Sequence, residues 1–211
     1  MSRAQDLARL AGELQARIEA LPDHVDPSWL TPPGPAGSAA GASAAVPPEI
    51  RGAVSQGWFL RLCDTLPPLD LLEDSGARLA LMDRSSLLAR LCALALMGRP
   101  GVLRCCVQRN ARLALQQSLG PAFAVLRARD GGPAVPPEVA GWPPIAWSWV
   151  GYRELARAGT WPDRGLRRMV RLALPASRAD APRPRMVPRA STAARDRLRA
   201  LETLFAGDSP C

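Results

Sequence analysis

The residues that could do chemistry in this chain are few, and their types restrict what that chemistry could be. The sequence has 27 basic side chains, all of them arginine, and one histidine, His24. Without lysine there can be no phosphate-loop, Schiff-base or kinase-type lysine. A nucleophile and base pair would require His24 to meet one of the cysteines. We therefore expect no enzymatic activity and no cofactor.

The surroundings of His24 offer one candidate metal site. Asp23 and Asp26 flank it in a short segment bounded by prolines. Adjacent acids between prolines are more often turn residues that hydrogen-bond their own backbone than metal ligands. We favour the turn and expect no metal, and we predict that Trp29 and Leu30 anchor this turn on the core.

The cysteines and the paired acids give no stronger signal. No C-x-x-C pair is present, and an odd number of cysteines in helical segments argues against a disulfide framework. Glu73 and Asp74 are the one adjacent acidic pair, which we place in a solvated loop. We favour buried thiols in a reducing compartment over a metal or redox site. The five cysteines are Cys63, Cys92, Cys105, Cys106 and Cys211.

The positive charge belongs to the second half of the chain. Residues 1–100 hold 9 arginines and 11 acidic residues, for a net charge of −2, whereas residues 101–211 hold 18 and 8, for a net charge of +10. A functional interpretation is an acidic partner or a nucleic acid. The alternative is a base-composition bias in the gene that raises arginine, alanine and proline together.

The stretch around which the other helices must pack is 82–129. It is nearly all apolar over 87–97, which predicts a buried helix. A turn at 98–100 leads into a second predicted helix, whose apolar residues step by four along one side, and Gly120 ends it before a third short helical piece. The predicted core positions of the second helix are Leu103, Val107, Ala111, Leu115 and Leu119.

Several further segments show helical periodicity or helix-end signals. Residues 2–21 have a narrow apolar seam and a possible capping box of Ser2 with Gln5, so we expect this helix to dock on the body of the protein. The other predicted helices begin at Glu49, run from Pro143 to Ala158 before Gly159, run from Asp163 to Leu174, and follow a cap at Ser191 or Thr192. No strand-like alternation and no repeat is found, which predicts an all-α fold class.

Composition divides the chain into a single irregular multi-helix domain with flexible Pro/Ala/Arg-rich tethers. The last helix could bind in the groove of another protein or dock on its own body. The predicted parts are 1–30, an amphipathic helix with an anchoring turn; 31–48, a disordered linker; 49–174, a helical core; 175–190, a Pro/Arg-rich tether; and 191–211, a C-terminal amphipathic helix.

Neither a signal peptide nor a membrane span is predicted. Charged residues fall within the first turns of the N-terminal helix, and the longest uncharged run in the apolar stretch is 91–98. A span needs about 20 apolar residues. We expect a cytoplasmic protein.

Arginines lie opposite the apolar side of two predicted helices, where they could select an acidic partner surface. We expect charge reversal at Arg167 and Arg168 to weaken partner capture without unfolding the protein. The candidate partner-binding residues are Arg104, Arg109, Arg112, Arg164, Arg167, Arg168 and Arg171.

Aromatic residues are concentrated just before the helix predicted from Asp163 to Leu174. Trp142, Trp147, Trp149 and Trp161 are four of the six tryptophans. Aromatic rings beside arginines can stack nucleic-acid bases. At this spacing they are more often core or protein-interface residues, which is the interpretation we favour.

Three segments carry a family resemblance. The string that runs from 112–115 through 119–127 resembles the later half of the SctK family, the cytoplasmic accessory proteins of bacterial type III secretion systems, and the turn at 98–104 is similar too. Residues 26–30 look like the early segment of the branch found in plant-associated bacteria. The resemblance covers roughly 20–130, and this chain has Pro121-Ala122 where many members have acidic residues after the glycine.

The resemblance implies a helical, non-enzymatic adaptor of the sorting platform, the cytoplasmic assembly beneath the injectisome. Such an adaptor joins the cytoplasmic domain of the inner-membrane ring protein (SctD) to the pod protein (SctQ), and would lie peripherally at the base of the apparatus. The residues alone leave two alternatives. One is an arginine-rich nucleic-acid-binding protein, motivated by the charge of the second half. The other is an unrelated helical chaperone or regulator of secretion.

Overall fold

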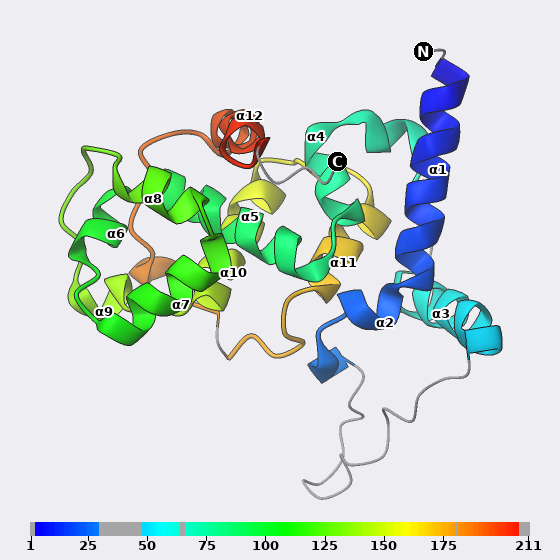
Figure 1. Ribbon diagram of the computed structural model, residues 1–211, viewed down its shortest axis with the longest axis horizontal. Coiled ribbons are helices and arrows are strands. Elements are labelled where there is room, and N and C mark those ends of the chain that lie inside the picture. Colours follow the sequence, from blue (N-terminus) through cyan, green and yellow to red (C-terminus); the bar gives the residue numbers. More distant parts are fainter. Residues whose placement is uncertain (1–2, 30–47, 64–65, 180, 207–211) are drawn as a thin grey trace, which may run out of the picture. The chain divides into compact units, whose positions relative to one another are not determined.

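The computed structural model describes residues 3–29, 48–63, 66–179 and 181–206. Within these ranges every regular element is an α-helix or a short 3-10 helix, so the predicted all-α class is confirmed (Figure 1). The chain divides into two compact units. The first unit comprises Met1–Arg84 and Trp161–Ser177, and the second comprises Ser85–Thr160 and Arg178–Cys211.

These two units do not follow the boundaries expected from composition. Residues 49–84 of the predicted helical core group with the N-terminal helix, while residues 178–211 group with the central stretch. Whether the five predicted parts fold separately stays a prediction. The predicted linker, apart from its last residue, lies outside the described residues, as do Ser2 of the predicted capping box and Leu30 of the predicted anchor.

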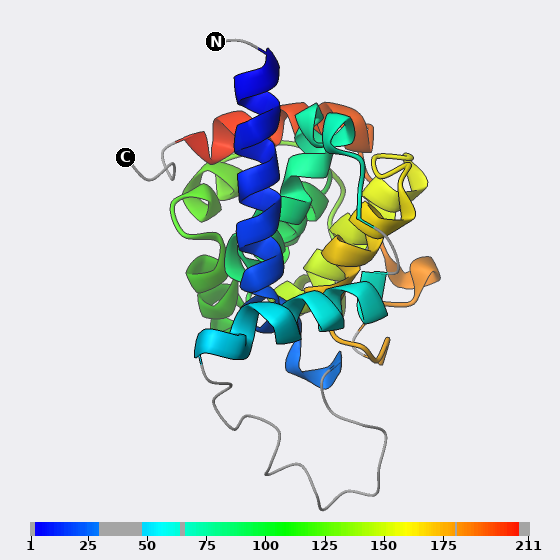
Figure 2. The same ribbon diagram turned by 90° about the vertical axis from the view of Figure 1, so that its right-hand side faces the viewer.

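The first unit is built from two long helices and several short ones. Figure 2 shows α3 crossing the C-terminal end of α1, and these two helices contact each other. Its elements are α1 (Arg3–Glu19), α2 (Leu21–His24), η1 (Pro27–Trp29), α3 (Pro48–Cys63), η2 (Leu69–Glu73), α4 (Ser75–Arg78), η3 (Leu79–Leu81) and α11 (Arg164–Leu172).

The apolar seam of α1 docks on this unit, as the sequence predicts. Leu10, Leu14 and Ile18 are buried along one side of the helix, and Leu21 follows them into the core. Asp163 begins α11 by accepting a hydrogen bond from the backbone N–H of Leu166 at 2.9 Å. The apolar face of α11 is buried in the same unit.

The second unit is organised around α5, which is buried along most of its length. Every residue from Leu91 to Arg99 is buried in this unit. The elements of the second unit are α5 (Arg84–Met97, whose first residue groups with the first unit), α6 (Gly101–Cys105), α7 (Arg109–Leu119), α8 (Ala122–Arg127), α9 (Pro137–Ala140), α10 (Pro144–Arg157), η4 (Pro184–Met186) and α12 (Ala194–Leu204).

Helix α10 lies directly against α5. Proline at its first turn and Gly159, with a φ of 70°, after its last turn begin and end it where the sequence predicts. Gly151 gives the closest approach, because a Cβ at this position would lie 2.0 Å from the carbonyl oxygen of Leu91. Trp147 and Trp149 of the same helix are fully buried. The core interpretation of these tryptophans is therefore confirmed.

The predicted single helix from 101 to 120 is wrong. The chain leaves the helical conformation at Cys106, which has a ψ of 87°, and enters it again after Gln108, which has a ψ of 115°. Val107, predicted to be in the core, is 76% exposed. Residues spaced by four advance about 40° around a helix at each step. A stripe from Leu103 to Leu119 would therefore wind by about 160°, and the break lets both ends be buried.

The N-terminus of α12 also differs from the prediction. Its N-cap residue is Ala193, and no side chain caps the helix. Ser191, one of the two predicted caps, instead donates from its backbone N–H to the carbonyl oxygen of Gly98 at 2.9 Å. Leu198, Leu201 and Phe205 of this last helical segment are buried within the second unit. Of the two alternatives for this helix, docking on its own body is the one observed.

Candidate functional site

The seven predicted partner-binding arginines do not form one surface within either unit. Arg104, Arg109 and Arg112 belong to the second unit, whereas the four arginines of α11 belong to the first. Each group is therefore considered within its own unit. Whether any of them binds a partner stays a prediction.

Arg104 and Arg171 donate hydrogen bonds to backbone carbonyls of their own unit. Arg104 donates to the carbonyl oxygens of Gly131 and Gly132, the latter at 3.3 Å. Arg171 donates to the carbonyl oxygens of Leu174 at 3.0 Å, Pro175 at 2.7 Å and Ala176 at 2.9 Å. Such bonds satisfy carbonyls that have no partner within a helix. Arg104 and Arg171 therefore stabilise the neighbouring backbone in addition to carrying charge.

Two exposed candidates, Arg109 and Arg112, lie on α7. Arg109, Arg112, Leu113 and Gln116 are spaced by three or four residues, which places them on one face of that helix, and all four are exposed. Leu113 is 44% exposed at the centre of this face. We call these four residues the α7 face. It combines an apolar side chain with flanking cations, a composition typical of protein interfaces.

The arginines of α11 differ in exposure along the helix. Arg164 and Arg167 are exposed, and Arg168 is partly buried. Arg171 also stacks on the indole ring of Trp29, with its guanidinium carbon 4.7 Å from the ring centroid. The indole Nε1 of Trp29 donates to the carbonyl oxygen of Leu174 at 2.8 Å. The predicted anchoring role of Trp29 is confirmed.

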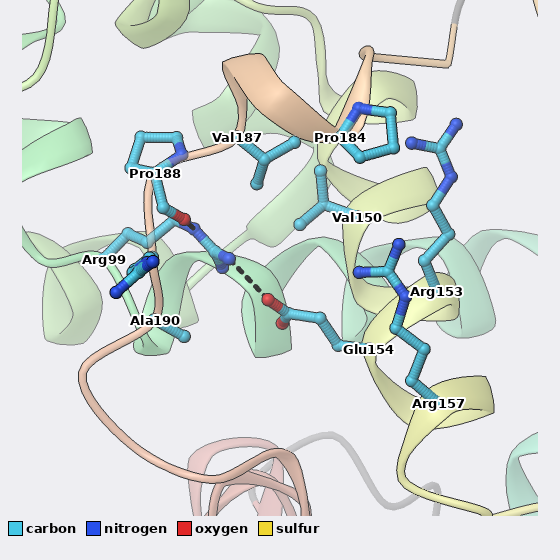
Figure 3. Close-up of a pocket in the computed structure, with 10 residues that line it drawn as sticks. Arg99, Val150, Arg153, Glu154, Arg157, Pro184, Val187, Pro188 and Ala190 are labelled. Carbon is cyan, nitrogen blue, oxygen red and sulfur yellow. Dashed lines mark hydrogen bonds and ion pairs between the residues drawn. The ribbon is translucent and has the colours of Figure 1, made fainter.

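A buried ion cluster in the second unit was missed by the sequence analysis. Glu154 of α10 accepts a hydrogen bond from Arg99 at Oε1 (Figure 3). Its Oε2 accepts one from Arg197 at 2.8 Å. The side chains of Arg99 and Arg197 are 3% and 5% exposed. Arg197 also donates to the carbonyl oxygen of Leu94 at 2.7 Å. We call these three charged residues the Glu154 cluster, and it connects α5, α10 and α12.

The sequence contains one weak signal for this cluster. Arg99 is the charged residue that follows a run of buried apolar residues, directly between Gly98 and Pro100. A Cβ at Gly98 would lie 2.8 Å from Nη1 of Arg197, so the absence of a side chain there makes room for the guanidinium. The partners could not be identified from the sequence, because Glu154 lies 55 residues from Arg99 and 43 residues from Arg197.

His24 lies in a buried cationic environment in the first unit. Its Nε2 is 3.0 Å from the carbonyl oxygen of Met169, and its Nδ1 has no hydrogen-bond partner among the described residues. Burial, with the nearby charges of Arg17 and Arg84, lowers the pKa of His24 to about 4 against the opposing effects of the Met169 carbonyl and Asp83. A proton on His24 is therefore disfavoured.

The residues beside His24 behave as turn residues. Asp26 Oδ1 accepts hydrogen bonds from the backbone N–H and the hydroxyl of Ser28, at 3.0 and 2.6 Å. Asp26 also pairs with Arg84. In the part of the chain that the structure describes, no three His, Cys, Asp or Glu side chains lie together as a metal site.

The remaining candidates for chemistry are the cysteines and the adjacent acids Glu73 and Asp74. Cys63, Cys92 and Cys106 are buried, as predicted, whereas Cys105 is partly buried and Cys211 lies outside the described residues. Burial raises the pKa of Cys92. Glu73 and Asp74 are exposed, as predicted, and Asp74 caps α4 by accepting from the backbone N–H of Gly76 at 2.7 Å. None of the described helices is both long enough and apolar enough to cross a bilayer.

Comparison with known proteins gives one match. The family model described as bacterial type III secretion protein (HrpB4) matches residues 1–206. Neither the curated proteins nor the solved structures include a chain that matches this one.

Proposed function

This chain belongs to the HrpB4 family of bacterial type III secretion proteins, and from this membership we propose that it is a non-enzymatic adaptor of the sorting platform. In this proposal it corresponds to an SctK protein. It would join the cytoplasmic domain of the inner-membrane ring protein to the pod protein, and would lie peripherally at the inner-membrane base of the apparatus.

The observation that carries the proposal is the extent of the family match. It covers residues 1–206 and so includes both compact units. The resemblance of the segments near 98–104 and 112–127 to SctK proteins supports the choice of this particular component in the proposal. The described residues also offer protein-binding surface, which an adaptor requires.

The α7 face is the surface that best fits a protein partner. Leu113 would supply apolar area, and Arg109 and Arg112 would pair with acidic side chains around it. Arginines at the rim of an interface act mainly on the rate of association and on the choice of partner. The three segments of the resemblance include Arg112 and Leu113, whereas Arg109 lies outside them.

A pull-down with the two proposed partners tests this assignment. Purified ring-protein cytoplasmic domain and pod protein serve as baits, and the variant is R109E/R112E. We expect capture of one bait to fall about tenfold or more, because each reversal replaces attraction by repulsion. The variant R127E/R199E makes the same change in net charge at two other exposed arginines of the second unit and is expected to bind like wild type.

The α11 arginines are tested in the same assay with R167E/R168E, which is expected to weaken capture while thermal unfolding stays unchanged. If both double variants capture both baits normally, the arginine assignment is wrong. If the wild-type chain captures neither bait, or if cells without it export effectors normally, the adaptor proposal itself is wrong.

The charge of the second half still favours one other function. A nucleic-acid-binding protein with a net charge of +10 over residues 101–211 would bind DNA or RNA with a steep salt dependence. Arg99, Arg104 and Arg197 of the second unit donate to protein acceptors, which reduces the charge available to phosphates. A gel shift at low salt that shows no retention would exclude this function.

A further inference from the structure

The second unit contains a cavity that the predicted site residues do not touch. It has a volume of about 380 Å³ and lies between α10 and the segment 184–190. Four residues of α10 line one wall, spaced by three or four positions and therefore on one face of the helix: Val150, Arg153, Glu154 and Arg157. The other wall is formed by Pro184, Val187, Pro188, Arg189 and Ala190, and Arg99 completes the lining.

The segment that forms the second wall is fixed to the helices by hydrogen bonds. Arg153 donates to the carbonyl oxygen of Pro182, and Arg99 donates from Nε to the carbonyl oxygen of Pro188 at 2.6 Å. Ser191 then bonds to Gly98 beyond the end of the wall. The segment was predicted to be part of a tether, and its described residues form one side of a cavity here.

The cavity has an excess of positive charge. Glu154 is the sole carboxylate among the described residues that line it, and each of its oxygens already accepts from a buried arginine. Figure 3 shows Glu154 turned toward Arg99, with the side chains of Arg153 and Arg157 beside it on α10. Arg153, Arg157 and Arg189 also line the cavity, and its one acidic lining residue among the described residues, Glu154, is already paired with Arg99 and Arg197.

The surroundings of Arg153 disfavour its positive charge. Burial lowers its pKa, and the nearby charges of Arg157 and Arg178 lower it further. Its guanidinium also stacks on Trp149, 5.7 Å from the ring centroid. A bound carboxylate would offset both the lost hydration and the repulsion between the cations.

The rest of the lining determines what kind of anion fits. Val150 is buried at the base, and Pro184, Val187 and Pro188 present apolar side chains on the opposite wall. No aromatic ring lines the cavity within the described ranges, so a nucleobase would have nothing on which to stack. A chain that carries carboxylates next to an aliphatic side chain complements both the cations and the apolar wall.

We propose that this cavity binds an acidic segment of a partner protein, with carboxylates paired to Arg153, Arg157 and Arg189 and an aliphatic side chain against Pro184 and Val187. The proposal rests on the adaptor function for the identity of the partner. The site differs from the α7 face, and it includes none of the seven arginines predicted from the sequence.

Fluorescence anisotropy with a labelled synthetic peptide tests the proposal on the full chain. The probe is a short peptide in which glutamate and leucine alternate, and two control peptides replace glutamate by glutamine or leucine by serine. We expect the probe to bind and both control peptides to bind about tenfold more weakly or worse, since each lacks one half of the complementarity.

Two variants locate the binding. R153E/R157E is expected to lower the affinity for the probe at least tenfold, and R157E/R189E is expected to do the same while keeping the hydrogen bond from Arg153 to Pro182. The second variant guards against loss of folding, which thermal unfolding by circular dichroism monitors. R127E/R199E makes an equal change in net charge at two exposed arginines of the second unit outside both proposed sites and is expected to bind the probe within about twofold of wild type.

Three results would overturn the proposal. They are no binding of the probe by the wild-type chain, equal binding by R157E/R189E, and displacement of the probe by single-stranded oligothymidylate at equal charge concentration, which would show a nucleic-acid site. The assay contains no secretion component, so its failure leaves the adaptor function untouched. Failure of the pull-down with wild-type protein equally leaves the cavity proposal standing.

Discussion

The two units of this protein stabilise buried arginines in different ways. In the first unit, Arg17 donates to the carbonyl oxygen of Leu81 at 3.0 and 3.3 Å, and Arg171 bonds the carbonyls that follow α11. In the second unit, Arg99 and Arg197 share a carboxylate. Backbone carbonyls thus accept hydrogen bonds from buried arginines in both units, and in the second unit a shared carboxylate adds an opposite charge.

This difference determines how each unit responds to a change in charge. A carbonyl dipole cannot be titrated or removed by mutation, so the arginines of the first unit keep their acceptors under most conditions. A carboxylate can be lost, and its loss leaves two cations buried together. The second unit therefore depends on one side chain, whereas the first is sensitive chiefly to added protons near His24.

The largest expected effect is at Glu154. E154Q removes the negative charge and leaves the guanidinium groups of Arg99 and Arg197 buried without a counter-charge, which typically costs about 3–5 kcal/mol. We therefore expect hydrogen exchange in α5, α10 and α12 to become faster, and the exchange rates of α1 and α3 to change less. Peptide-resolved mass spectrometry measures these rates.

The matched control for this variant is E138Q, which removes the charge of an exposed glutamate in the same unit. It is expected to leave exchange unchanged, because isolated surface charges contribute little to stability. Equal protection in wild type and E154Q would show that the cluster does not stabilise the second unit.

The second prediction concerns acid and the first unit. The pKa of His24 is about 4 in the folded chain and has a reference value of 6.5. Between these values the unfolded chain binds more protons than the folded chain, so the free energy of unfolding falls as the pH falls from 6.5 toward 4. Full protonation of His24 in the folded chain would lower the free energy of unfolding by about 3 kcal/mol.

Urea denaturation at a series of pH values measures this dependence, and H24Q isolates the contribution of His24. Glutamine can still donate to the carbonyl oxygen of Met169, but it does not titrate. We expect the variant to lose less stability than wild type between pH 6.5 and pH 4, by about 3 kcal/mol. Identical pH profiles for the two proteins would contradict the assignment.

The sequence predicts those parts of the fold that local signals determine. Gly159 follows α10 and α11 starts directly after Asp163, both as expected, because helix ends and left-handed backbone depend on neighbouring residues. The break between α6 and α7 was not predicted, since Leu103 and Leu119 are buried by different neighbours that periodicity does not reveal.

The candidate sites show the same limit. A count of arginines cannot distinguish Arg167, which is exposed, from Arg171, which bonds three carbonyls of its own unit. Arg153 and Arg157 line one cavity because the segment 184–190 packs beside α10, and this segment is remote from α10 in sequence. Contacts of this kind arise from the tertiary fold and have no local signature.

The smallest expected effects sharpen the comparison through two glycines. Gly151 in α10 faces the carbonyl oxygen of Leu91, whereas Gly12 in α1 has no atom within 4 Å of the position of a Cβ. G151A should destabilise the second unit by about 1–3 kcal/mol, since a backbone carbonyl cannot move as easily as a side chain. G12A should stabilise the first unit by up to about 1 kcal/mol, because alanine restricts the unfolded chain and favours a helix. Peptide-resolved hydrogen exchange should show opposite changes in α10 and α1, and the same sign at both sites would mean that helix propensity outweighs packing in the second unit.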